Sequence, residues 1–262
     1  MNVVILCGGN GTRLSEYTSV KPKSMVEIGD IPLLLHIMSI YSFYGYKKFI
    51  LAVGYKGNYI KEFFHNFRVL KNDLRIRLDG KTQVENLTIS EEFKDWEIDI
   101  IDTGINTPKL NRIEKVKKYI NSDNFHLTYG DGLGNINIRE LTEFHKGHRG
   151  IATITAVCPP VRFGQITLDN NTVTSFEEKK LSNNEFINGG FFVFNKEGFF
   201  EYSHSSGFKS FEFDFLKSLS LDKKLKAFVH TDFWQCMDNI KDKEYLESLA
   251  NSENIPWRDL KC

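Results

Sequence analysis

A glycine-rich loop followed by cationic side chains stands close to the N-terminus. It follows an apolar run of strand length at residues 2–7 (Asn-Val-Val-Ile-Leu-Cys). The residues of this stretch that could do chemistry are Gly8, Gly9, Gly11, Arg13, Lys21 and Lys23. Because glycine has no Cβ, the backbone can turn tightly and present several N–H groups to one anion, while the cations add positive charge. The pattern indicates a polyphosphate site, and its alternative is a strand-to-helix turn without a ligand.

Two common glycine-loop motifs do not fit. A dinucleotide-binding fingerprint needs a third glycine three residues after Gly11, and Leu14 stands there. A Walker-type loop ends in Gly-Lys-Ser or Gly-Lys-Thr, whereas Thr12 and Arg13 follow Gly11. The loop is followed instead by Lys-Pro-Lys at 21–23, in which the proline has a fixed φ and stiffens the approach to the second lysine. This arrangement of cations favours the phosphate site over the bare turn.

An aspartate flanked by two glycines follows another predicted strand. Residues 125–129 are the strand, and Gly130, Asp131 and Gly132 come directly after it. In an open parallel sheet, ligands bind outside the carboxyl ends of the strands, so Asp131 and the glycine loop are candidates for the same rim. Mg²⁺ prefers one or two protein carboxylates, with waters and phosphates as its other ligands. Asp131 therefore fits a magnesium ligand, and an ordinary Gly-Asp-Gly turn is its alternative.

Five stretches of the chain carry a resemblance to a known family. They are 11–28 (Gly-Thr-Arg-Leu-Ser-Glu-Tyr-Thr-Ser-Val-Lys-Pro-Lys-Ser-Met-Val-Glu-Ile), 128–132 (Thr-Tyr-Gly-Asp-Gly), 159–164 (Pro-Pro-Val-Arg-Phe-Gly), 188–192 (Asn-Gly-Gly-Phe-Phe) and 233–238 (Phe-Trp-Gln-Cys-Met-Asp). The set resembles the signature of the sugar-1-phosphate nucleotidylyltransferases. The first stretch is most similar to the glucose-1-phosphate cytidylyltransferase branch. The resemblance covers nearly the whole chain.

The resemblance implies a Mg²⁺-dependent reaction of CTP with glucose 1-phosphate that gives CDP-glucose and pyrophosphate. A sugar 1-phosphate carries about −1.5 to −2 charge at neutral pH, so its oxygen can attack the α-phosphorus without a general base. Arg13 and Lys23 are then the expected catalytic residues, and Asp131 and Asp238 are the expected metal ligands. For Asp238 the alternative is a helix N-cap. The same reaction with another base or another phosphorylated acceptor stays open, as does a non-catalytic module that senses a sugar nucleotide.

The expected nucleotide site combines the glycine loop with a second loop near residue 104. Its residues are Leu6, Gly8, Gly9, Gly11, Thr12, Arg13, Lys23, Thr103, Gly104, Arg112 and Asp131. Thr103 or a nearby loop carbonyl could accept a hydrogen bond from the exocyclic amine of cytosine. The cytidylyltransferase branch has a glycine-rich stretch with an arginine before its next helix, and here Lys109 or Arg112 would take that role.

The expected acceptor site lies in the second half of the chain. The resemblance assigns to it Tyr129, Gly164, Glu178, Lys179, Asn188 and Gly189. Glu178 would accept hydrogen bonds from sugar hydroxyls, and Lys179 would hold the sugar phosphate. Lys180 replaces a proline that is frequent in the family at this position, which leaves the particular sugar open.

Composition excludes several other classes of protein. Lys plus Arg and Asp plus Glu both number 34, so no global field favours nucleic acid or an anionic membrane. The chain has no apolar stretch of roughly 18 to 20 residues and no basic leader, so we expect a cytoplasmic protein. The cysteines are widely spaced, as expected of free thiols. His145 and His148 have helical spacing but no third ligand nearby, which favours a solvated helix end over a metal site.

Strands and helices alternate along most of the sequence. Strands are predicted at 2–7, 48–53, 74–78, 97–102, 125–129, 151–157, 164–168, 173–177 and 187–194, and helices at 31–44, 57–67, 109–120, 138–148, 210–220 and 239–250. Such alternation predicts a Rossmann-like α/β fold with a doubly wound, mostly parallel sheet. We expect one domain over 1–262, in which 1–135 mainly binds the nucleotide and 136–262 forms an acceptor-binding lobe. The resemblance also implies a homo-oligomer.

Overall fold

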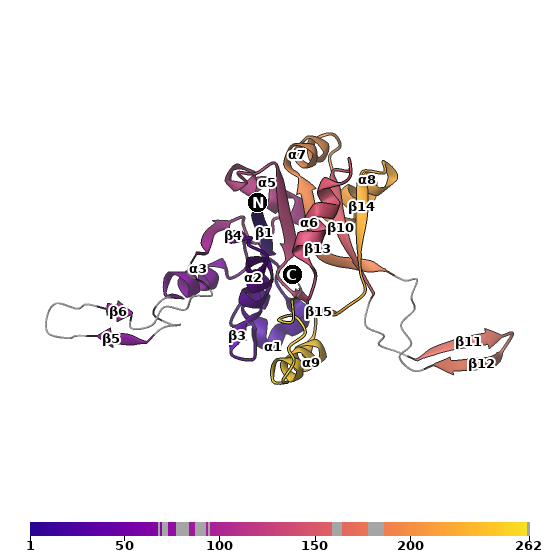
Figure 1. Cartoon of the computed structure of the whole chain (residues 1–262), viewed down its shortest axis with the longest axis horizontal. Helices are drawn as coiled ribbons and strands as arrows, with labels where there is room; N and C mark the ends of the chain where they lie inside the picture. Colours follow the sequence, from indigo (N-terminus) through magenta and orange to yellow (C-terminus); the bar gives the residue numbers. More distant parts are fainter. Residues whose placement is uncertain are drawn as a thin grey trace.

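A seven-stranded sheet forms the centre of the molecule (Figure 1). The computed structural model describes the whole chain except residues 68, 70–72, 77–83, 87–92, 94, 159–163, 178–185 and 261–262. The strand order is β14-β10-β13-β8-β1-β4-β7. The strands are β1 (Asn2–Cys7), β4 (Lys48–Val53), β7 (Glu97–Asp102), β8 (Asn124–Tyr129), β10 (Ala152–Val157), β13 (Ile187–Asn195) and β14 (Leu225–His230). Only β13 pairs antiparallel with its neighbours in this sheet, so the predicted mostly parallel α/β sheet is confirmed.

Helices cover both faces of the sheet because successive side chains of a strand point to opposite sides. In β1, Val3 and Ile5 belong to one core cluster, and Val4 and Leu6 belong to the other. The first cluster includes side chains of α2 (Leu33–Phe43), α3 (Gly57–His65), α6 (Ile138–Lys146) and α9 (Ile240–Ala250). The second includes side chains of α5 (Lys109–Val116), α7 (Lys196–His204) and α8 (Lys217–Leu221). The sheet is thus doubly wound, with strands from both halves of the chain.

Short antiparallel pairs lie outside the central sheet. They are β2 (Glu27–Ile28) with β3 (Ile31–Pro32), β5 (Leu74–Ile76) with β6 (Val84–Asn86), β9 (Gly132–Gly134) with β15 (Trp234–Cys236), and β11 (Gln165–Asp169) with β12 (Thr172–Glu177). Figure 1 shows the β5–β6 and β11–β12 pairs at opposite ends of the molecule, away from the sheet. None of the helices in the described part of the chain is long and apolar enough to cross a membrane.

Several local predictions need correction. The helix expected from residue 31 begins at Leu33, because Ile31–Pro32 pairs with Glu27–Ile28. The helix expected near 210–220 begins as a π-helical segment, Phe211–Leu216, before α8. His145 is not solvated: it is buried, and its Nδ1 lies 2.8 Å from Thr153 Oγ1. The sequence pattern did not predict α7, β14 or β15. Of the strand expected at 74–78, residues 77 and 78 lie outside the described residues.

Candidate active site

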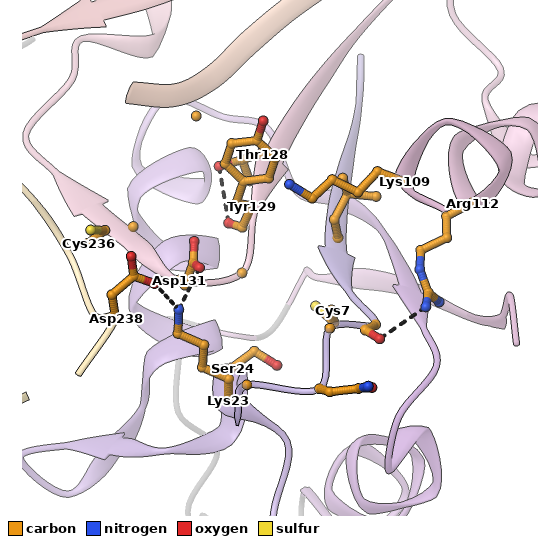
Figure 2. Close-up of a pocket in the computed structure, with 18 of the residues that line it drawn as sticks. Cys7, Lys23, Ser24, Lys109, Arg112, Thr128, Tyr129, Asp131, Cys236 and Asp238 are labelled. Atoms are coloured by element: carbon orange, nitrogen blue, oxygen red, sulfur yellow. Dashed lines mark hydrogen bonds and ion pairs between the residues drawn. The ribbon is translucent and has the colours of Figure 1, made fainter. Parts of the chain in front are cut away.

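A cavity of about 890 Å³ opens at the carboxyl ends of β1 and β8. The glycine loop and the loop from Ile105 to Lys109 line the part of the cavity where the sequence predicts the nucleotide. Gly130 to Gly132 and the start of β13 line the remainder, together with Glu212 and Trp234. Figure 2 shows the lining side chains converging from these separate segments. The arrangement agrees with the general position of ligands in open α/β sheets.

Most of the residues expected at the site line this one cavity. They are Leu6, Gly8, Gly9, Gly11, Thr12, Arg13, Lys23, Arg112, Tyr129, Asp131, Asn188, Gly189 and Asp238. Three expected residues do not line it, namely Thr103, Gly104 and Gly164. Glu178, Lys179 and Lys180 lie outside the described residues.

Thr103 and Gly104 of the second loop form hydrogen bonds with other residues of the protein. Thr103 is fully buried, and its hydroxyl donates a hydrogen bond to the Val53 carbonyl at 2.7 Å. The amide of Gly104 donates to Asp102 Oδ1 at 2.9 Å. The structure therefore does not bring the Thr103 hydroxyl to the cavity. Gly164 packs beside Phe176 of the β11–β12 pair, where an added Cβ would lie 2.9 Å from the ring.

Lys23 joins the two aspartates that the resemblance names as metal ligands. Its Nζ lies 2.8 Å from Asp131 Oδ2 and 2.7 Å from Asp238 Oδ1 (Figure 2). Arg13 Nη1 lies 3.0 Å from the other oxygen of Asp238. Burial acts to lower the pKa of Lys23, but the two carboxylates outweigh it and raise that pKa above its ordinary value. Lys23 is therefore a charged ammonium in this cluster.

Pairing of β9 with β15 brings Asp238 to Asp131. Cys236 pairs with Gly132, and the amide of Met237 donates to the Asp131 carbonyl at 2.8 Å. The helix-cap alternative for Asp238 is wrong, because the next residue caps α9. The Asn239 side chain accepts from the Asp242 amide at 3.0 Å, and the Asp242 side chain accepts from the Asn239 amide at 3.2 Å. The position of Asp238 is thus fixed by the strand pair before it and the helix start after it.

The donor set of this cluster fits a magnesium ion that also binds phosphate. The two carboxylates each direct an oxygen at one cation, the Lys23 ammonium. Among the described residues, no group of three or more His, Cys, Asp or Glu side chains could hold a metal ion. A metal at the two aspartates would then need waters or substrate phosphates as further ligands, which is the coordination that Mg²⁺ prefers.

The glycine loop owes its shape to one residue with positive φ. Gly11 has a φ of 61°, and its carbonyl accepts hydrogen bonds at 3.0 Å from both the Leu14 amide and the Thr18 hydroxyl. A Cβ at Gly11 would also lie 2.7 Å from Thr18 Cγ2. A left-handed backbone and a close neighbour together explain why glycine stands here. At Gly9, by contrast, an added Cβ would meet nothing within 4 Å, so neighbouring atoms do not require glycine there.

A chain of polar contacts closes the end of the cavity where the sequence predicts the acceptor. Tyr129 donates to Glu212 Oε1 at 2.9 Å, and the Asn188 amide group donates to the Tyr129 hydroxyl at 3.2 Å. Lys109 forms an ion pair with Glu212, and its Nζ lies 4.6 Å from the Tyr129 ring centroid. Burial, followed by the Glu212 charge, raises the pKa of Tyr129, so the phenol stays protonated and donates.

Two residues that line this end of the cavity were not predicted from the sequence. Glu212 stands on the π-helical segment, a geometry that often accompanies functional sites but that no sequence pattern here predicts. Trp234 was quoted only as part of a motif, yet its Nε1 donates to the Gly189 carbonyl at 2.8 Å and so helps to place this wall. Neither Glu212 nor Trp234 belongs to a sequence pattern that, by itself, predicts a binding role.

Comparisons with known proteins show the family to which this chain belongs. A family model described as nucleotidyl transferase matches residues 2–259, so the chain belongs to the nucleotidyl transferase family. Curated glucose-1-phosphate cytidylyltransferases of Salmonella typhi and Salmonella typhimurium are each 40% identical over 260 residues, which is 98% of this chain and 99% of theirs. The crystal structure of HddC from Yersinia pseudotuberculosis superposes with a TM-score of 0.63 at 25% identity, covering 94% of this chain and 98% of that one. The family expected from the sequence is confirmed.

Proposed function

We propose that this chain transfers a cytidylyl group from CTP to glucose 1-phosphate, giving CDP-glucose and pyrophosphate. The observation that carries the proposal is the cluster of Arg13, Lys23, Asp131 and Asp238 on one cavity in a member of the nucleotidyl transferase family. The base and the sugar come from the cytidylyltransferases that are similar to the chain over almost its whole length.

The proposed chemistry is a direct displacement at phosphorus. A phosphate oxygen of glucose 1-phosphate forms a new bond to the α-phosphorus of CTP, and the bond from that phosphorus to the bridging oxygen of pyrophosphate breaks. The electron pair of the broken bond leaves with pyrophosphate. Because the attacking oxygen is already charged, no side chain has to remove a proton, and the main barrier is repulsion between two anions.

The cationic residues of the cavity reduce that repulsion. Arg13 and the amides of the glycine loop would neutralise the departing pyrophosphate. Lys23 would stabilise the negative charge that gathers around the reacting phosphorus, in a partly buried position where electrostatic interactions are stronger than in water. Asp131 and Asp238 would hold Mg²⁺, which when bound supplies charge neutralisation at the phosphate oxygens.

The acceptor end supplies hydrogen-bonding groups suited to a sugar. Asn188, Tyr129 and Glu212 are polar, line the cavity and already bond to one another, so hydroxyl groups of a sugar could exchange with these bonds. We keep Glu178 and Lys179 as predicted sugar and phosphate ligands. Since Thr103 is buried and does not line the cavity, we assign the acceptor for the cytosine amine to a carbonyl of the lining loops. A homo-oligomeric state and a cytoplasmic location stay predictions.

The test is a substrate matrix. Pyrophosphate release is measured with CTP, UTP, dTTP and GTP, each combined with glucose 1-phosphate and with several other sugar 1-phosphates. Turnover concentrated in the pair of CTP and glucose 1-phosphate supports the proposal. Turnover concentrated in another pair keeps the reaction type and overturns the base or the sugar. Absence of pyrophosphate release with every pair, from a folded protein that binds nucleotide, favours the sensing module.

A further inference from the structure

Arg112 lies buried beneath the glycine loop and joins separate segments of the nucleotide end. Its Nη2 donates to the Gly8 carbonyl at 3.0 Å and to the Ile105 carbonyl at 2.8 Å. Its Nη1 donates to the Val53 carbonyl at 3.2 Å and to the Thr103 hydroxyl at 2.6 Å. Figure 2 shows the side chain reaching from α5 towards the backbone after Cys7. One guanidinium therefore ties the glycine loop, the end of β4 and the loop from 103 to 105.

Two glycines leave the space that this guanidinium occupies. A Cβ at Gly8 would overlap the Nη1 and Cζ atoms of Arg112 and would lie 2.8 Å from its Nε. A Cβ at Gly54 would overlap Nη1 as well and would lie 2.7 Å from the Gly104 carbonyl. Neither glycine has a positive φ. Glycine is therefore required at position 8 because a larger residue would collide with Arg112. The glycine motif had suggested a different reason, namely freedom of the backbone to turn.

The buried charge of Arg112 is compensated by oxygen dipoles. All its hydrogen bonds to described residues are accepted by carbonyl or hydroxyl oxygens, and the Asp102 carboxylate acts on its charge without forming an ion pair with it among the described residues. Burying a charge without a carboxylate is costly unless every donor is well placed. A neutral side chain could fill the volume at lower cost, so the residue type points to a task beyond packing.

We propose that Arg112 is a positioning residue for nucleotide binding: it fixes the separation of the Gly8 loop and the Ile105 loop and so sets affinity and base selection. These two loops line the same cavity, and Arg112 is the described side chain that bonds to both. Lys115 supports the arrangement from behind, because its Nζ donates to the Thr103 carbonyl at 2.8 Å. The inference depends on the proposed function in one respect: the proposed function assigns the nucleotide to this end of the cavity.

The test uses the overlap between Gly8 and Arg112. Gly8→Ala, Arg112→Ala and the double variant are titrated calorimetrically with CTP in the presence of Mg²⁺, and Arg139→Ala, an exposed arginine on α6 outside the cavity, is the control. Loss of two or more hydrogen bonds predicts that each single variant raises the Kd for CTP about tenfold or more. The double variant is expected to bind no worse than Arg112→Ala within about twofold, because removal of the guanidinium makes room for the alanine methyl.

Steady-state kinetics of the Arg112 variants distinguish a positioning role from a general disruption of the structure. For Arg112→Ala we expect a raised KM for CTP, a kcat lowered by no more than a few-fold, an unchanged KM for the sugar phosphate and a smaller ratio of kcat/KM for CTP over UTP. Arg112→Lys keeps the charge but cannot donate to four acceptors, so it is expected to restore little of the CTP affinity. Full recovery by lysine would show that charge alone matters and would overturn the positioning role.

Further outcomes distinguish the inference from the proposed function. If Gly8→Ala weakens binding equally in both backgrounds, or if Arg112→Ala binds CTP like the control, the inference is wrong. If wild-type protein prefers another triphosphate, the base assignment fails, and the same cycle measured with that nucleotide still tests Arg112. Thermal unfolding is measured on every variant, and should Arg112→Ala fail to fold, the cycle is run with Arg112→Lys in its place.

Discussion

Lys23 and Asp238 lie 2.7 Å apart, Nζ to Oδ1, and the same ammonium lies 2.8 Å from Asp131 (Figure 2). The lysine that is expected to assist nucleotidyl transfer is thus paired with both expected metal ligands. A divalent cation that binds these carboxylates has to compete with the ammonium, because each carboxylate already directs an oxygen at it. We therefore expect binding of a metal to be linked to release of Lys23 from these carboxylates.

Replacement of Lys23 by glutamine is expected to strengthen binding of Mn²⁺, used as a spectroscopic substitute for Mg²⁺, in the absence of nucleotide. The variant removes the competing ammonium, so the dissociation constant measured by electron paramagnetic resonance should fall several-fold. Asp238→Asn is the matched comparison and should weaken Mn²⁺ binding, since it removes a charged ligand from a site with few others. Unchanged Mn²⁺ affinity in Lys23→Gln would contradict the competition, and unchanged affinity in Asp238→Asn would contradict the metal site.

Replacement of Lys23 is expected to lower turnover, although it is also expected to strengthen metal binding. Lys23→Ala is expected to lower kcat by about 10²- to 10³-fold, the range found when one group that stabilises a transition state is removed. The protein should remain folded, because the side chain lies at the cavity wall and contributes little to the core. Thermal unfolding followed by circular dichroism provides the control. Turnover within a few-fold of wild type would remove Lys23 from the catalytic group.

Base selection is expected to favour CTP over UTP. A carbonyl that accepts from the cytosine amine is left without a donor when uracil presents its own carbonyl, which costs about 1–3 kcal/mol and disfavours UTP about 5- to 150-fold. The ratio of kcat/KM values, measured with glucose 1-phosphate held constant, gives this number directly. Comparable values for the two triphosphates would refute the assignment of the base.

The local part of the site could be predicted from the sequence, and the part assembled by distant pairing could not. The loop at Gly11 and the strand end at Asp131 follow apolar runs whose length and order predict parallel strands, and both end at one cavity. Nothing in the residues around Asp238 indicates that β15 pairs with β9, so its place beside Asp131 depended on the resemblance. The task of Gly8 was also hidden, because a glycine that makes room for a side chain looks like one that permits a turn.

Glu212 illustrates a further limit of sequence reasoning. Its partners Tyr129 and Lys109 lie in the first half of the chain, and the carboxylate reaches them from a π-helical segment. Neither a short motif nor helical periodicity predicts such a contact. Lys115 is a related case, because no sequence pattern predicts that it donates to the Thr103 carbonyl.

A buried histidine that does not line the cavity is expected to link stability to pH. His36 on α2 is buried, and its Nδ1 accepts from Trp257 Nε1 at 3.1 Å while its Nε2 donates to the Ile28 carbonyl at 2.9 Å. Both ring nitrogens are used in the neutral form, so protonation of Nδ1 would break the bond to Trp257. Burial lowers the pKa of His36 to about 4, and the nearby Arg258 acts in the same direction.

The folded protein is therefore expected to lose stability as pH falls below about 6.5, the ordinary histidine pKa. Between about pH 6.5 and about pH 4 the unfolded chain binds a proton at His36 that the folded chain does not, so the free energy of unfolding decreases as pH decreases. Burial lowers the pKa of His126 and His145 too, so these add to the slope with the same sign. Urea unfolding followed by tryptophan fluorescence at several pH values measures the slope. His36→Gln, which keeps a donor and an acceptor but cannot titrate, should flatten it in part, and an unchanged slope would show that His36 does not titrate in this window.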